Sequence, residues 1–133
     1  MDDESIADVD GLLRRVPNWP NMTIRCQQTG QLRATSACFK DRATENREVS
    51  VTLEKELLQA NKTHQDAAKV EGFGLAKVEA GFVRNNLSQR QIINRDPIED
   101  DPHHALIIGD KTNKDLSKIS RNSVLLIEPD EET

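Results

Sequence analysis

Apolar residues along this chain come in short runs that are separated by charged segments and by glycine or proline. The runs at residues 105–108 and 124–127 contain only apolar residues, which predicts two strands buried on both faces. Between them, apolar residues spaced as on one helix face predict a helix over residues 113–120, with Asn113 as its N-cap. The pattern therefore predicts a strand–helix–strand unit in the last third of the chain.

The first half of the chain predicts further short elements. Residues 22–27 and 32–39 form a predicted hairpin, because the segment between them contains Thr29–Gly30, a turn sequence. Residues 49–53 alternate apolar and polar side chains as a half-buried strand does, and they lead directly into a helix. Thr52 is the predicted N-cap of that helix, since acidic residues occupy the first turn behind it.

The middle of the chain predicts a second helix, a strand and a helical turn. Thr63 begins a capping-box-like sequence for a helix over residues 64–71, which Gly72 ends. Residues 75–79 alternate as a strand and residues 80–86 form a helical turn, although both segments also fit one helical stripe. The order of elements predicts an α+β fold, a single domain with a mixed sheet of short strands and a few short helices.

The length of 133 residues fits one domain, which we place at residues 12–128. Residues 1–11 form an acidic leader that we expect to be flexible, and residues 129–133 form an acidic tail. No run approaches the roughly 18 apolar residues of a membrane-spanning helix, and the acidic start lacks the features of a secretory signal. We therefore expect a cytoplasmic protein without membrane association. Cys26 and Cys38 lack the spacing of a metal finger, so in that reducing compartment we expect both to be free thiols.

Charge is distributed unevenly along the chain, although the net charge is only −5. Basic residues dominate residues 12–42, and acidic residues dominate both ends. Two interpretations are open: the acidic ends are solubilising surface, or the basic segment binds an anion or an acidic partner with which the ends compete. The negative total, with only three phenylalanines and one tryptophan, argues against nucleic acid as a partner.

Unusual polar chemistry gathers in residues 92–109, which contain two prolines and two adjacent histidines. His103 and His104 point to opposite faces if the segment is extended, and no third spaced histidine accompanies them, so we predict no metal site. His104 beside Asp96 or Asp101 is a candidate general base, with Ser36 or Cys38 as the candidate nucleophile. The Asp–Pro pairs of this stretch favour the alternative that it simply forms turns.

Arg14 and Arg15 are the candidates for anion binding. Two adjacent guanidinium groups beside apolar residues can be held against the fold, where they clamp a phosphate or a carboxylate. The glycines on either side of Phe73 follow a predicted helix and lack the rest of a nucleotide-binding fingerprint. We therefore predict no cofactor.

Four short motifs are spread over residues 12–110: a double arginine at Arg14, SACF from Ser36, GFGL from Gly72, and DP…DPHHAL from Asp96. Together they resemble a set of small bacterial proteins that have a double arginine near the start, an S-A-x-F segment and a D-P…D-P-x-H-A-L segment. The resemblance implies a bacterial single-domain protein, and it brings no activity with it.

Two functional hypotheses follow. The first is an accessory protein without catalytic activity that binds a protein partner or associates with itself, which the charge distribution and the missing catalytic signature favour. The alternative is a small enzyme or ligand-binding domain that acts on a phosphate-bearing, nucleotide-like molecule through Arg14, Arg15 and His104. The alternative requires these three side chains to meet in one pocket.

Overall fold

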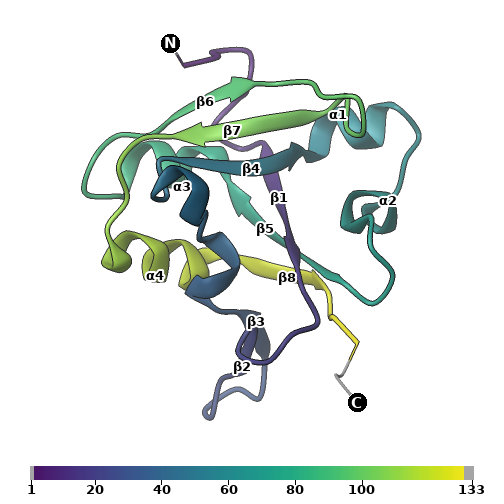
Figure 1. Ribbon diagram of the computed structural model, residues 1–133, viewed down its shortest axis with the longest axis vertical. Coiled ribbons are helices and arrows are strands. Elements are labelled where there is room, and N and C mark those ends of the chain that lie inside the picture. Colours follow the sequence, from purple (N-terminus) through teal and green to yellow (C-terminus); the bar gives the residue numbers. More distant parts are fainter. Residues whose placement is uncertain (1, 131–133) are drawn as a thin grey trace.

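The computed structural model describes residues 2–130 as a six-stranded sheet with short helices on both faces (Figure 1). In spatial order, the strands are β6 (Ile92–Arg95), β7 (His104–Ile108), β4 (Glu48–Leu53), β1 (Gly11–Val16), β5 (Gly74–Glu79) and β8 (Val124–Ile127). Every pair of neighbouring strands is antiparallel. The first strand of the chain therefore lies in the interior of the sheet, between β4 and β5.

The segment between β1 and β4 forms a small hairpin and two 3-10 helices. β2 (Thr23–Arg25) pairs with β3 (Leu32–Ala34), which confirms the predicted hairpin. The prediction of a strand up to residue 39 is wrong, because the chain winds into the 3-10 helix η1 (Ser36–Phe39) and buries its last two residues. Neither face of this segment is uniformly apolar, so a strand here would bury polar side chains. The second 3-10 helix, η2 (Arg42–Thr44), follows directly.

Helices cover both faces of the sheet. Neighbouring residues of a strand point to opposite sides, so the adjacent leucines of β1 place apolar side chains on both faces. Leu13 of β1 packs in a buried cluster with Leu57 and Ala67, which come from helices on one face. Leu12, one residue earlier, packs in a larger cluster with Leu116 on the other face. The helices of the first face are α1 (Glu54–Gln59) and α2 (His64–Ala68), and those of the second are α3 (Ala80–Asn85), α4 (Asn113–Asn122) and η1.

The α+β class and the strand–helix–strand ending are confirmed. β7 and β8 are joined through α4 and run in the same direction, with three strands between them. The prediction that both are buried on two faces is wrong. β7 alternates buried and partly exposed residues, and β8 is an edge strand whose Val124 is 61% exposed. An apolar run therefore occurs here on a strand that is only partly covered.

Two predicted helix caps are incorrect. Thr112, and not Asn113, caps α4, because its hydroxyl accepts from the N–H of Asp115 while the Asp115 carboxylate accepts from the N–H of Thr112. Thr52 does not cap α1, since its hydroxyl donates to the carboxylate of Asp101 at 2.6 Å. A threonine that the sequence assigns to local helix capping is thus used for a long-range contact.

The middle of the chain follows the prediction closely. The capping box at Thr63 is present and begins α2, which ends at Ala68 rather than at residue 71. The ambiguous stretch that follows is a strand and then a helix, as predicted, since β5 ends at Glu79 and α3 begins at Ala80. None of the helices within residues 2–130 has the length and apolar character needed to cross a membrane.

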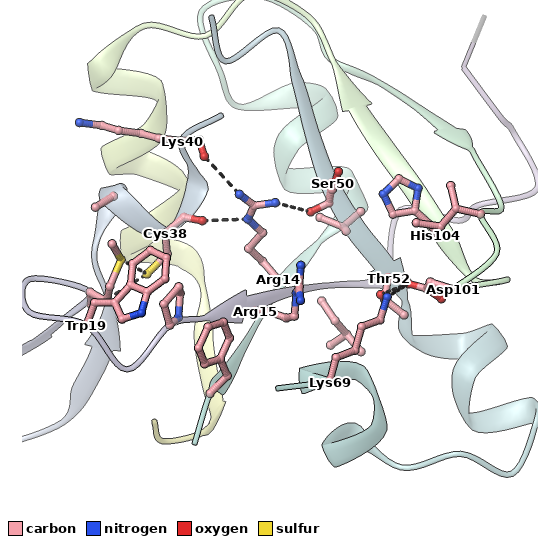
Figure 2. Close-up of a pocket in the computed structure, with 17 residues that line it drawn as sticks. Arg14, Arg15, Trp19, Cys38, Lys40, Ser50, Thr52, Lys69, Asp101 and His104 are labelled. Atoms are coloured by element: carbon pink, nitrogen blue, oxygen red, sulfur yellow. Dashed lines mark hydrogen bonds and ion pairs between the residues drawn. The ribbon is translucent and has the colours of Figure 1, made fainter. Parts of the chain in front are cut away.

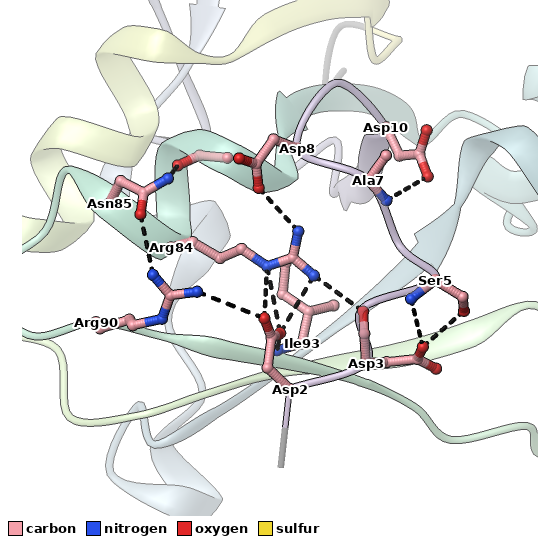
Figure 3. Close-up of polar contacts among 11 residues, drawn as sticks. Asp2, Asp3, Ser5, Ala7, Asp8, Asp10, Arg84, Asn85, Arg90 and Ile93 are labelled. Atoms are coloured by element: carbon pink, nitrogen blue, oxygen red, sulfur yellow. Dashed lines mark hydrogen bonds and ion pairs between the residues drawn. The ribbon is translucent and has the colours of Figure 1, made fainter.

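The acidic leader differs from the flexible segment that the sequence predicts. Ile6 is buried in the core, and the carboxylates of Asp2 and Asp8 form ion pairs with Arg84 of α3 (Figure 3). Charge alone indicated a solvated segment, but these carboxylates are the counter-ions of an arginine that is distant in the sequence. Of the predicted acidic tail, residues 131–133 lie outside the described residues.

Candidate pocket at the centre of the sheet

β1 and β4 are paired over only part of their length. The last register pair between them along β1 joins Leu13 to Thr52. β1 nevertheless continues to Val16 against β5, and β4 extends back to Glu48 against β7. The two neighbouring strands therefore separate beyond Leu13, and the sheet is open at its middle.

Arg14 fills the gap between the separated strands (Figure 2). Its Nη1 donates to the carbonyl of Ser50 on β4 at 2.8 Å, and its Nε donates to the carbonyl of Cys38 on η1 at 2.8 Å. Its Nη2 donates to the carbonyl of Lys40 at 3.2 Å. The side chain thus ties η1 to the sheet and supplies donors where strand pairing stops. Burial lowers the pKa of Arg14 from its ordinary value, yet a guanidinium stays protonated at neutral pH.

The opening forms a pocket of about 400 Å³, a size that holds a small organic ligand. Figure 2 shows Trp19 on one side of the pocket and His104 on the other, with the two adjacent arginines between them. Among the described residues of the lining, the ionised side chains are four cations and one carboxylate, namely Arg14, Arg15, Lys40, Lys69 and Asp101. This balance is the reverse of the net charge of −5 for the whole chain.

Arg15 and Lys69 bring two of these positive charges from different elements. Arg15 points to the opposite face of β1 from Arg14, and it reaches the same pocket because the sheet is open here. Arg15 is exposed, and no carboxylate of the described residues forms an ion pair with it. Lys69 follows α2 with a φ of 63°, a conformation that is uncommon for a residue with a side chain. Backbone strain of this kind clusters at binding sites.

Asp101, the carboxylate of the pocket, is buried and already engaged. The hydroxyl of Thr52 donates to it at 2.6 Å, the N–H of His103 donates at 2.9 Å, and the ammonium of Lys69 lies at 3.3 Å. Burial raises the pKa of Asp101, but these hydrogen bonds and the ammonium outweigh burial and hold the pKa below its ordinary value. Asp101 is therefore ionised at neutral pH and compensates Lys69, and no carboxylate of the described residues forms an ion pair with Arg14 or Arg15.

The structure brings only some of the predicted site residues together. His104 lines the pocket with Arg14 and Arg15, and its Nδ1 lies 2.8 Å from the carbonyl oxygen of Asp96. The Asp96 carboxylate lies 3.3 Å from the same nitrogen, but Asp96 is exposed and does not line the pocket. Ser36 begins η1 and also lies outside the lining, so the predicted pair of Ser36 and His104 is not formed. Cys38, the other predicted nucleophile, lines the pocket, but its buried thiol donates to the carbonyl of Met22 at 3.0 Å.

The two adjacent histidines line different cavities. His103 lines a smaller cavity beside α1 and α2, where its Nε2 is buried without a hydrogen-bond partner among the described residues. Its Nδ1 lies 3.9 Å from the carboxylate of Glu56. Within residues 2–130, no three His, Cys, Asp or Glu side chains are grouped in a way that could hold a metal ion.

The aromatic side of the pocket was not predicted from the sequence. Trp19 is 58% exposed, and its ring meets that of Phe73 edge-on, with 6.1 Å between the centroids. A tryptophan between two prolines was the available signal, because exposed aromatic residues are enriched at binding surfaces. Lys69 left no such signal, since its position depends on where α2 ends.

Comparisons with protein-family models, with curated proteins and with solved structures find no match for this chain. The resemblance to small bacterial proteins therefore stays a prediction.

Proposed function

We propose that the pocket binds a small molecule that combines a phosphate, or an equivalent anionic group, with a flat ring, as a nucleotide does. The observation that carries this proposal is that two arginines without an ion-pair partner among the described residues and an exposed tryptophan line one pocket. Guanidinium groups bind phosphate oxygens through paired, charge-assisted hydrogen bonds. An exposed indole offers a surface on which a ring can stack.

The two arginines have different parts in this proposal. Arg14 uses three of the five N–H donors of a guanidinium on backbone carbonyls, so it supplies mainly a fixed positive charge. Arg15 is exposed and has its donors available for direct contact with the anion. Lys40 lines the pocket and accepts from Arg14 through its carbonyl, but its ammonium points away from the two arginines in Figure 2 and has no part in this proposal.

We propose binding and not catalysis at this site. Covalent chemistry needs a nucleophile and a base within hydrogen-bond reach of each other. Ser36 lies outside the pocket that His104 lines. Cys38 lines the pocket, but its buried thiol donates to the carbonyl of Met22 at 3.0 Å, and burial raises its pKa. Asp96 contacts the Nδ1 of His104, which leaves the Nε2 of the ring as a hydrogen-bonding group for the ligand.

The free thiols support a cytoplasmic setting for this function. Cys26 is exposed and Cys38 is buried, and neither forms a disulfide, as expected in a reducing compartment. Together with the resemblance to bacterial proteins, this supports an accessory role in a bacterial cytoplasm. In that role the protein carries or senses the ligand on behalf of a protein partner.

Trp19 provides the test, because it is the single tryptophan of the chain and lies in the wall of the pocket. Adenosine monophosphate is titrated into the protein while indole fluorescence is recorded, with adenosine and inorganic phosphate as partial ligands. We expect adenosine monophosphate to quench the fluorescence at millimolar concentration or below, and we expect weaker binding of either part alone.

Arg15→Gln removes the available guanidinium and is expected to weaken this binding about tenfold, because a hydrogen bond to a charged group contributes about 1.5–3 kcal/mol. Arg42→Gln is the matched control, since Arg42 is also exposed but lies on η2, outside the pocket. Unchanged affinity in Arg15→Gln would contradict the proposal, and so would the absence of quenching by all three ligands.

A further inference from the structure

The two edge strands of the sheet differ in how their outer backbone groups are covered. At β6, the leader lies alongside the strand: the N–H of Asp3 donates to the carbonyl of Ile93, and the N–H of Ile93 donates to the carboxylate of Asp2, both at 2.8 Å. At β8, no backbone hydrogen bond joins Val124–Ile127 to any described residue outside β5 and β8. β8 therefore presents unpaired N–H and C=O groups to another strand.

The sequence of β8 does not block strand addition. Edge strands are commonly protected by charged side chains or by proline within the strand. β8 consists of Val, Leu, Leu and Ile, its first residue is exposed, and the other three are partly exposed. An apolar edge without charges is suited to receive a strand, and it is a hazard for aggregation if nothing covers it.

A basic groove accompanies this edge. It has a volume of about 600 Å³ and lies between β8 and the β2–β3 hairpin, which is beside β8 in Figure 1. Among the described residues, three arginines and one glutamate contribute the charges of its lining, namely Arg25, Arg33, Arg121 and Glu128. Within the described residues, no carboxylate forms an ion pair with Arg33 or Arg121. The groove therefore carries positive charge that an incoming acidic segment can neutralise.

We propose that β8 receives an extended acidic segment of a protein partner as an additional strand of the sheet. The free backbone groups supply the hydrogen bonds, the exposed Val124 supplies an apolar contact, and the arginines select acidic side chains on the incoming strand. A second copy of this chain fits less well, because two-fold pairing of β8 strands brings the basic grooves of the two copies together. This inference does not depend on the ligand proposed for the pocket.

A short synthetic peptide in which glutamate alternates with valine and threonine tests the proposal. The peptide carries a fluorophore at its N-terminus, and the full-length protein is titrated into it while anisotropy is recorded. We expect saturable binding that weakens as salt is added, because the arginines of the groove are partly screened. We also expect slower amide hydrogen exchange in residues 124–127, since their outer N–H groups become hydrogen-bonded.

A second peptide separates strand addition from simple attraction of charges. It has the same sequence, but alternate backbone nitrogens are methylated, so that it keeps its charge and loses its inter-strand donors. We expect it to bind about tenfold more weakly than the unmodified peptide. Equal binding of the two peptides would mean that no strand is added, and this result would overturn the inference.

Charge reversal in the groove tests the choice of partner. The double variant Arg33→Glu, Arg121→Glu is expected to weaken peptide binding about tenfold or more, whereas Arg42→Glu, on η2 outside the groove, changes it by less than about twofold. Circular dichroism confirms that each variant is folded. The inference fails if a single-stranded oligonucleotide binds more tightly than the peptide. It also fails if the free protein is a stable dimer in sedimentation that the peptide does not dissociate.

Discussion

Arg84 and Arg14 both direct a guanidinium group into the protein, but they meet different partners there. Arg84 is 4% exposed and lies between the carboxylates of Asp2 and Asp8, at 3.0 and 2.9 Å (Figure 3). Arg14 donates to backbone carbonyls, and no carboxylate of the described residues forms an ion pair with it. Arg84 is thereby neutralised, whereas Arg14 keeps its positive charge.

This difference distinguishes a structural ion pair from a cation that is available to a ligand. A carboxylate at ion-pair distance cancels most of the attraction that an arginine exerts on an external anion. Carbonyl dipoles hold the Arg14 guanidinium in place, and the carboxylate of Asp41 acts on its charge only from beyond ion-pair distance. The carboxylates of the leader therefore neutralise Arg84, whereas Arg14 brings a positive charge to the proposed binding site between β1 and β4.

Replacing Arg84 with methionine is expected to have the largest effect on stability. The substitution leaves two carboxylates without their counter-ion, and breaking a buried ion pair costs about 3–5 kcal/mol. Because the Asp8 side chain is 64% exposed and can be solvated, we expect a loss near the lower end, about 3–4 kcal/mol. Urea denaturation at neutral pH measures the change in the free energy of unfolding.

Arg90→Met is the matched control for this substitution. Arg90 also contacts Asp2, but at 3.7 Å and with 62% of its side chain exposed, so its removal should change stability by less than about 1 kcal/mol. If the two variants are equally destabilised, the buried guanidinium does not hold the leader. Arg84 would then not be the structural ion pair with which Arg14 is compared.

Lys111 extends the comparison to a cation that can lose its proton. Its ammonium is held, like the guanidinium of Arg14, by backbone carbonyls alone, and these belong to Asn46, Arg47, Ile107 and Gly109. Burial lowers the pKa of Lys111 to about 8, whereas a lysine in the unfolded chain has a pKa of about 10.4. Between these values the unfolded chain keeps the proton and the folded protein releases it.

Stability is therefore expected to rise with pH from about 8 to about 10.4, and this contribution is lost as the pH falls through that window. The rise is expected to be about 2–3 kcal/mol, since one pKa unit corresponds to about 1.4 kcal/mol. Lys111→Met should remove the rise, and chemical denaturation at both ends of the window measures it. Lys114→Met, at an exposed position of α4, should leave the rise intact. If stability still rises with pH in Lys111→Met, the rise comes from groups other than Lys111.

The elements that the sequence predicts well are those stabilised by nearby residues. The capping box at Thr63 and the change from strand to helix at Ala80 are local features, and both are present. The separation of β1 from β4 depends on where a long-range ladder ends, which no local pattern contains. The role of the leader was missed for the same reason, since Asp2 and Arg84 are 82 positions apart.

The candidate site was predictable by residue type but not by geometry. The two predicted arginines and His104 line one pocket, as the ligand-binding hypothesis required. The sequence could not indicate that carbonyls hold Arg14, or that Trp19 and Lys69 complete the lining, because these contacts join segments that only the fold brings together. Ser36 was assigned incorrectly to the same site, since a 3-10 helix replaces the strand that was predicted there.

Arg14→Met is expected to destabilise the protein less than Arg84→Met does, and it tests whether carbonyl groups alone hold a buried guanidinium. Three carbonyls lose a charged donor, but the pocket is open and water can replace part of what is lost, so we expect about 2 kcal/mol. Arg14→Lys keeps the charge and cannot reach all three carbonyls, so it should be destabilised to a similar extent.

Binding of adenosine monophosphate, followed through Trp19, then separates charge from geometry. We expect affinity to fall in Arg14→Met and to fall less in Arg14→Lys, because the lysine still places a positive charge in the pocket. If both variants lose binding equally, Arg14 acts by holding η1 against β4 and its charge is not what attracts the ligand. If Arg14→Met is as stable as the unmodified protein, the carbonyl contacts do not hold the opening of the sheet together, and Arg14 is comparable to an exposed arginine rather than to Arg84.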